Sequence, residues 1–180
     1  ESPIMTKAIP TIQKFMTYSP HTIGADQTMV HAHRLMREHK IRHLPVLRGG
    51  HIVGVLSDGD LNLIETLKDV NPETVLVEDA MTEAPYTVGP ETPLDEVVAS
   101  MAEHKYGSTV VLQNEKVVGI FTTVDACRAF AELLQHAVLA DRRIADQERA
   151  ALRVISRPRR HRLDRDGAAI GVDPLSRRDS

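Results

Sequence analysis

The segment Val53-Gly54-Val55-Leu56-Ser57-Asp58-Gly59-Asp60 decides the fold, because its pattern returns 65 positions later as Val118-Gly119-Ile120-Phe121-Thr122-Thr123-Val124-Asp125. Each copy is a short apolar run, typical of a buried strand, followed by a hydroxyl residue and an aspartate three residues further on. The hydroxyl can cap a helix or bind a phosphate near the helix's positive end, and the aspartate can accept hydrogen bonds from paired sugar hydroxyls. Helix capping alone explains one copy. Two copies in register favour a binding site.

The repeat extends well beyond these two segments. Residues 15–61 align with residues 80–126 without a gap, and 14 of the 47 pairs are identical, where ordinary composition gives about three. Each copy predicts a short extended piece, an amphipathic helix, a two-stranded hairpin and a closing helix, which is a β-α-β-β-α unit. About fifty residues rarely bury enough core alone, so we expect the two units to pack together.

The predicted fold class is therefore mixed α+β, with two repeats related by a pseudo-two-fold axis and a C-terminal extension. The boundaries that the sequence favours are a lead-in over 1–11, a first repeat over 12–68, a linker over 69–76, a second repeat over 77–135 and an extension over 136–180.

The extension differs in composition from the rest of the chain. From residue 141 onward it holds eleven arginines, no lysine and seven acidic residues, although the whole chain carries a net charge of −3. An amphipathic helix to about residue 155 would suit docking on a partner subunit. The basic run 156–162 suits an anionic surface, but it has no aromatic residue for base stacking, so nucleic acid is disfavoured. A solvated, partly disordered tail is the third reading.

The chain is expected to be cytoplasmic and not bound to a membrane. Its lone cysteine, Cys127, excludes an internal disulfide and fits a reducing compartment, and we expect this side chain to be a buried small hydrophobe. No run of about 18 apolar residues is present. The nine histidines do not have the spacing of metal ligands, and no catalytic constellation is apparent. Ordinary helix capping is the expected function of Asp58.

Taken together, these motifs resemble a tandem cystathionine-β-synthase (CBS) domain pair, also called a Bateman module. The resemblance covers roughly residues 12–135. The residues that carry it are Phe15-Met16-Thr17, Ala80-Met81-Thr82, Ile41-Arg42-His43-Leu44-Pro45-Val46 and the two Gly-x-x-[Ser/Thr]-x-x-Asp turns.

The resemblance implies two clefts between the repeats that bind AMP, ADP or ATP, with S-adenosylmethionine or NAD as further candidate ligands. The resemblance also implies that Asp60 and Asp125 accept hydrogen bonds from ribose hydroxyls and that Ser57 and Thr122 bind phosphate. The remaining implied ligand-binding residues are Thr22, Ile23, Thr87 and Val88 at the adenine, and Arg42 and His43 at the phosphate of the site that uses Ser57 and Asp60.

The two predicted sites differ in charge. Arg42-His43 aligns with Gly107-Ser108, so the second site lacks two phosphate-binding groups, and charge-assisted hydrogen bonds are about twice as strong as neutral ones. We therefore expect unequal sites in a non-enzymatic regulatory homodimer that senses adenine nucleotides. The alternative is a protein-interaction scaffold with degenerate nucleotide sites, whose basic tail contacts nucleic acid or a partner protein.

Overall fold

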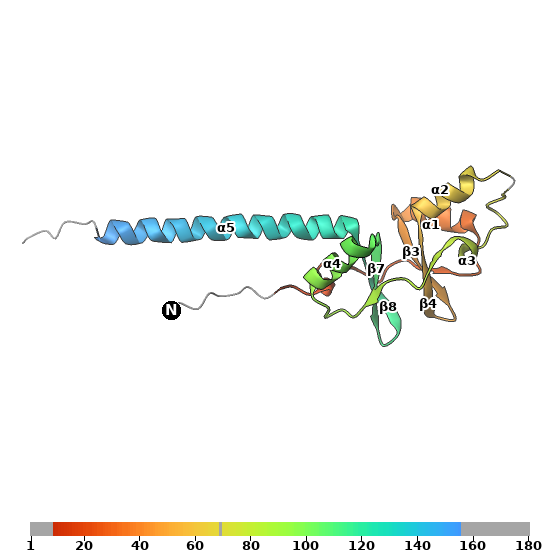
Figure 1. Cartoon of the computed structure of the whole chain (residues 1–180), viewed down its shortest axis with the longest axis horizontal. Coiled ribbons are helices and arrows are strands. Elements are labelled where there is room, and N and C mark those ends of the chain that lie inside the picture. The colour runs from red at the N-terminus through yellow and green to blue at the C-terminus, as the bar shows by residue number, and fades with distance from the viewer. Residues whose placement is uncertain (1–8, 69, 156–180) are drawn as a thin grey trace, which may run out of the picture. The chain divides into compact units, whose positions relative to one another are not determined.

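The computed structural model of the chain describes residues 9–68 and 70–155. The chain divides into two compact units, one ending at Leu133 and the other beginning at Leu134 (Figure 1). The first unit contains both sequence repeats. The first repeat opens with a 3₁₀ helix, η1 (Ile12–Lys14), and a short strand, β1 (Thr17–Tyr18).

Each repeat has the predicted β-α-β-β-α order, which confirms the mixed α+β class. The first repeat comprises β2 (Ile23–Gly24), α1 (Met29–His39), β3 (His43–Arg48), β4 (His51–Ser57) and α2 (Asp58–Thr66). The second repeat opens with α3 (Val77–Ala80) and β5 (Thr82–Glu83). Its β-α-β-β-α unit comprises β6 (Thr87–Val88), α4 (Leu94–His104), β7 (Ser108–Gln113), β8 (Lys116–Thr122) and α5 (Thr123–Ile155). In both, the first strand is parallel to the second, and the hairpin has a register shift at the same place.

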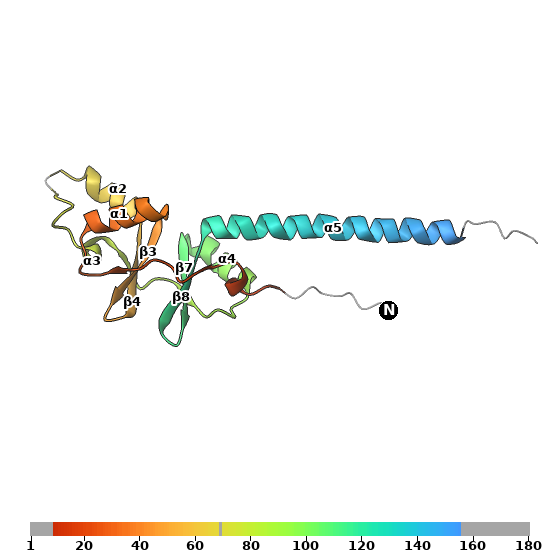
Figure 2. The same ribbon diagram turned by 180° about the vertical axis from the view of Figure 1, so that it is seen from behind.

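The helices form because their apolar residues recur at helical spacing. In α1, Met29, Ala32 and Met36 are buried, and the side chain of Thr28 accepts a hydrogen bond from the backbone N–H of His31 at the helix start. From both sides of the molecule, α1 and α2 are seen together against the β3–β4 hairpin (Figures 1 and 2).

The two repeats exchange edge strands, which the sequence repeat does not predict. The sheet orders are β2-β3-β4-β5 and β1-β8-β7-β6, so each sheet takes one strand from the opening segment of the other repeat. Two glycines permit this exchange. A Cβ on Gly54 would lie 2.4 Å from Sδ of Met81, and a Cβ on Gly119 would lie 2.4 Å from Sδ of Met16. The methionines therefore occupy the space that these glycines leave.

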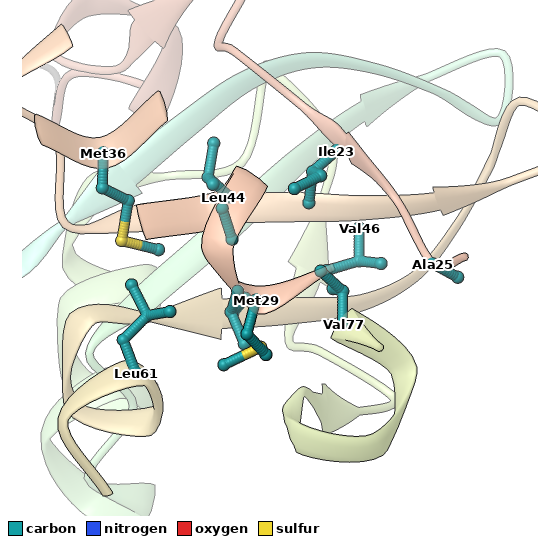
Figure 3. Close-up of a cluster of buried hydrophobic side chains, with 10 residues drawn as sticks. Ile23, Ala25, Met29, Met36, Leu44, Val46, Leu61 and Val77 are labelled. Carbon is teal, nitrogen blue, oxygen red and sulfur yellow. The ribbon is translucent and has the colours of Figure 1, made fainter. Parts of the chain in front are cut away.

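The hydrophobic cores follow the exchange. In the first cluster, Val77 of α3 is fully buried among side chains of the first repeat, and Figure 3 shows it beside Val46 and Met29. In the second cluster, Ile12 and Met16 pack with Val97, Val111 and other residues of the second repeat. Each core thus contains residues from the opening segment of the other repeat, and this couples the stability of the two repeats.

Helix α5 continues far beyond the second repeat, to Ile155, and the basic run 156–162 lies outside the described residues. Cys127 on α5 is exposed, so the prediction of a buried side chain is wrong. Its neighbours Ala126 and Ala129 face the core, and at 100° per residue Cys127 points away from them. Across the residues that the structure describes, no helix has the length and apolarity needed to span a membrane.

Candidate functional site

The two repeated turns form closely matched helix caps. At the start of α2, Oδ2 of Asp60 accepts hydrogen bonds from the backbone N–H of Ser57 (2.8 Å) and from its Oγ (2.7 Å). At the start of α5, Oδ2 of Asp125 accepts from the backbone N–H of Thr122 (2.9 Å) and from its Oγ1 (2.7 Å). Each aspartate thus uses one carboxylate oxygen for its own cap, which leaves Oδ1 as the oxygen that could accept from a sugar.

The Oδ1 atoms of the two aspartates have different surroundings. Oδ1 of Asp125 accepts a hydrogen bond from Nη1 of Arg128 at 3.0 Å, and the side chains of the pair are 8% and 74% exposed. Asp60 is half-buried, and within residues 9–68 and 70–155 no group donates a hydrogen bond to its Oδ1. Position 63, which aligns with Arg128, is an exposed leucine. The first repeat therefore has an accessible acceptor that the second repeat pairs internally.

Positive charge lies beside the cap of the first repeat. Nε of Arg42 donates to Oδ2 of Asp58 at 2.8 Å, and the backbone N–H of Asp58 donates to the carbonyl of Arg42 at 3.0 Å. Asp58 therefore anchors Arg42, while Ser57 and Asp60 supply the cap, so the expectation of a capping function for Asp58 is wrong. The Arg42 side chain is 70% exposed, and its two terminal nitrogens are therefore available to an anionic group.

His43 links the two caps. Burial lowers the pKa of His43 below the usual value of 6.5; the carboxylates of Asp58, Asp60 and Asp125 act against that shift, and Arg42 adds to it. Charged groups of both repeats therefore act on one imidazole. Nearby, the Thr123 backbone N–H donates to the carbonyl of Gly107 at 3.2 Å, just as Asp58 donates to Arg42.

Gly107 leaves room for this histidine. A Cβ at position 107 would lie 3.2 Å from Nε2 of His43, a contact that would require the ring to shift. The difference between Arg42 and Gly107 at aligned positions is therefore steric as well as electrostatic. The first repeat contributes a cation, and the second contributes the space that the imidazole of the first repeat fills.

The predicted adenine-binding residues lie elsewhere on the strands. Ile23 is buried in the first core, and with Thr22 it also lines a cavity of about 550 Å³ beside the β3–β4 turn. Thr87 is exposed and Val88 is half-buried on β6. Neither Ser57 nor Asp60 lines the cavity at Thr22, so the structure brings together the polar residues of the two caps but does not add Thr22 to them.

Sequence reasoning missed Arg128. It is one helical turn beyond Asp125, and the i, i+3 spacing of an acid and an arginine on a predicted helix was the signal that could have revealed the pair. Among the described residues, no group of three or more His, Cys, Asp or Glu side chains is placed to hold a metal ion.

The CBS domain profile matches residues 3–63 and again residues 77–132. The chain belongs to the CBS-domain family. The tandem CBS pair predicted from the sequence is thereby confirmed, and solved CBS structures have the same fold.

Three relatives illustrate how CBS pairs occur. An inosine-5′-monophosphate dehydrogenase of Korarchaeum cryptofilum is 34% identical over 67% of this chain, but this chain spans only 24% of that enzyme. Hypoxic response protein 1 of Mycobacterium tuberculosis is 26% identical over 72% of this chain and 89% of its own length. A structure of CBSX2 in complex with AMP is 26% identical, with a TM-score of 0.62, over 68% of this chain and 97% of CBSX2.

Proposed function

We propose that this CBS pair is a non-enzymatic regulatory module that binds AMP, ADP or ATP between its repeats. One observation carries the proposal: the half-buried carboxylate of Asp60 keeps one oxygen without a donor from the described chain, beside the Arg42 guanidinium. A nucleoside monophosphate has a diol to donate to a carboxylate and an anionic group to accept from a guanidinium and a helix start.

The complex of CBSX2 with AMP supports the choice of ligand, since 97% of CBSX2 aligns with this chain. We assign the ribose to Asp60 and the phosphate to Ser57, Arg42 and His43. We assign the base to Thr22 and Ile23 at one site and to Thr87 and Val88 at the other, because the strand positions of these residues offer backbone groups and apolar surface. S-adenosylmethionine and NAD share the adenosine part and remain candidate ligands.

The two sites are proposed to be unequal. At the second site, Thr122 and Asp125 match Ser57 and Asp60, but Arg128 pairs with the carboxylate and Gly107 replaces Arg42. A ligand there must displace the Arg128 guanidinium and gains no phosphate contact from position 107. The first site should therefore be occupied first, and the second site should favour a less anionic adenosine compound.

Regulation requires that the nucleotide bind one conformation of the module better than another. We place this module in a cytoplasmic homodimer with a protein target. The competing candidate is a scaffold whose sites are degenerate, and the internal pairing of Asp125 favours it at the second site only.

A thermal-shift panel of AMP, ADP, ATP, S-adenosylmethionine and NAD tests the proposal. A ligand at about 100 times its Kd stabilises a protein by roughly 2.7 kcal/mol, which for a chain of this size raises Tm by roughly 5–10 °C. We expect such a shift with at least one adenine nucleotide, and no shift with guanosine monophosphate at the same concentration.

An absence of any shift with all five compounds would favour the scaffold. Conversion of ATP to products during the incubation would contradict the non-enzymatic assignment. Both results are read from the same samples, because the nucleotides can be separated by chromatography after the melt.

A further inference from the structure

The exposed face of α5 has a heptad pattern that the nucleotide site does not explain. Within residues 130–151, apolar or uncharged residues recur at alternating spacings of three and four. We call this row the seam; it consists of Phe130, Leu133, Ala137, Ala140, Ile144, Gln147 and Ala151. The seven-residue repeat can be placed on a helix in seven registers, and the seam is the row of a and d positions in one of them. In each of the other six registers, the a and d positions of residues 130–151 include at least one Asp, Glu or Arg.

The seam is accessible along α5. Phe130 is 63% exposed and Ile144 is 54% exposed, while Leu133 is half-buried in the second core. The three alanines and Gln147 of the seam are exposed as well. The seam contains no charged residue, and its 3–4 spacing is the pattern of a coiled coil, although the exposed Leu134, Val138 and Leu139 lie off this row.

The charges that flank the seam identify the partner. With Phe130 and Ile144 at position a, His136 and Arg143 fall at position g, and Asp141 and Glu148 fall at position e. In a parallel pair of identical helices, position g meets position e of the partner five residues later in sequence. Arg143 of one copy then meets Glu148 of the other, and His136 meets Asp141.

The antiparallel arrangement has the opposite result. There, position e faces e and g faces g, so that Asp141 or Glu148 would meet an acid and Arg143 would meet a base. Like charges at these positions select against a pairing. The same side chains thus favour one orientation and disfavour the other, and a second copy of this helix supplies the charges that match them.

We infer that residues 130–151 of α5 form a parallel, in-register coiled coil with the same segment of a second copy of this chain. The small alanines of the seam allow close approach of the two backbones, and Phe130 and Ile144 supply the larger contacts. This surface lies outside the nucleotide site, and it stands whether or not the site binds AMP.

Disulfide trapping in the full-length chain tests the orientation. In a Cys127→Ser background, Ala140→Cys and Gln147→Cys are made separately, both at position d, with Arg142→Cys at the outward position f as the matched control. Mild air oxidation at micromolar concentration should link both seam variants into covalent dimers within an hour, with at least tenfold less dimer in the control. Circular dichroism checks that each variant keeps its helix content.

An antiparallel pair has one two-fold axis perpendicular to the helices, and only a residue close to that axis meets its own copy, so at most one of the two seam variants can be trapped efficiently. Trapping of only one seam variant, or of neither, would overturn the inference. If neither variant is trapped, the seam is a contact surface for a different protein. Adding Arg143→Glu should slow trapping of Ala140→Cys several-fold, and adding Glu148→Arg as well should restore it. An unchanged trapping rate with Arg143→Glu would overturn the proposed charge pairing.

Discussion

Replacing Arg128 with leucine separates two functions that this arginine could have at the second nucleotide site. Arg128→Leu gives the second repeat the residue that the first repeat has at position 63. In the structure, Nη1 of Arg128 donates a hydrogen bond to Oδ1 of Asp125 at 3.0 Å, so a ribose hydroxyl must displace the guanidinium to bind this carboxylate oxygen. Removing the arginine should therefore strengthen binding at the second site.

The size of the gain follows from the exposure of the pair. Because the Arg128 side chain is 74% exposed, solvent screens the interaction, and such pairs contribute about 0.2–1 kcal/mol. The affinity of the second site for adenosine should rise by up to about fivefold, since 1.4 kcal/mol is a factor of ten. The same loss should lower Tm by at most about 4 °C.

Isothermal titration calorimetry of adenosine and AMP provides the measurement, in an Asp60→Asn background that weakens the first site. Leu63→Ala serves as the control, because it changes the aligned position of the other repeat. If Arg128→Leu weakens AMP binding instead, the arginine turns from Asp125 to the phosphate, and the proposal that it blocks the site is refuted. Unchanged affinity for both ligands would show that Asp125 does not contact them.

Three further predictions concern the stability of the fold and its pH dependence. Ile12→Ala should lower the free energy of unfolding, measured in urea, by about 2–5 kcal/mol, because Ile12 is fully buried in the second core. Ile9→Ala, at a 56% exposed position, should change it little, and equal effects of the two substitutions would contradict the exchanged packing. Gly54→Ala should destabilise by about 1–3 kcal/mol, since its Cβ would lie 2.4 Å from Sδ of Met81, and Met81→Ala in the same chain should recover part of the loss. Because the pKa of His43 is lowered in the folded protein, the unfolded protein protonates this imidazole first on acidification. The free energy of unfolding should therefore fall as the pH drops below about 6.5. A His43→Asn variant whose free energy of unfolding depends on pH as steeply as that of the wild type would refute this assignment.

Much of the fold can be predicted from the sequence, because each repeat encodes its own order of elements. The spacing of Met29, Ala32 and Met36 predicts the buried face of α1, and the hydroxyl-x-x-Asp pattern predicts both helix caps. The exchange of β1 and β5 is not predictable in this way. It depends on long-range pairing, such as that of Thr82 with Val55, and strands of two residues carry almost no periodic signal.

The site was predicted in part for a similar reason. Local pattern places Ser57 with Asp60, and the aligned difference at positions 42 and 107 predicts unequal sites. The contact of His43 with the space above Gly107 arises only when the two repeats face each other. The exposure of Cys127 was mispredicted because a residue type, rather than its position on the helix, was used to assign burial.

Binding of AMP through Asp60 is the central claim, and calorimetric titration of AMP into wild-type protein, Asp60→Asn and the exposed-acid control Asp95→Asn tests it most directly. Hydrogen bonds to charged groups contribute about 1.5–3 kcal/mol, so Asp60→Asn should raise the Kd of the tighter site by roughly 10- to 100-fold, and Asp95→Asn should leave it unchanged. Wild-type affinity in Asp60→Asn would contradict the account.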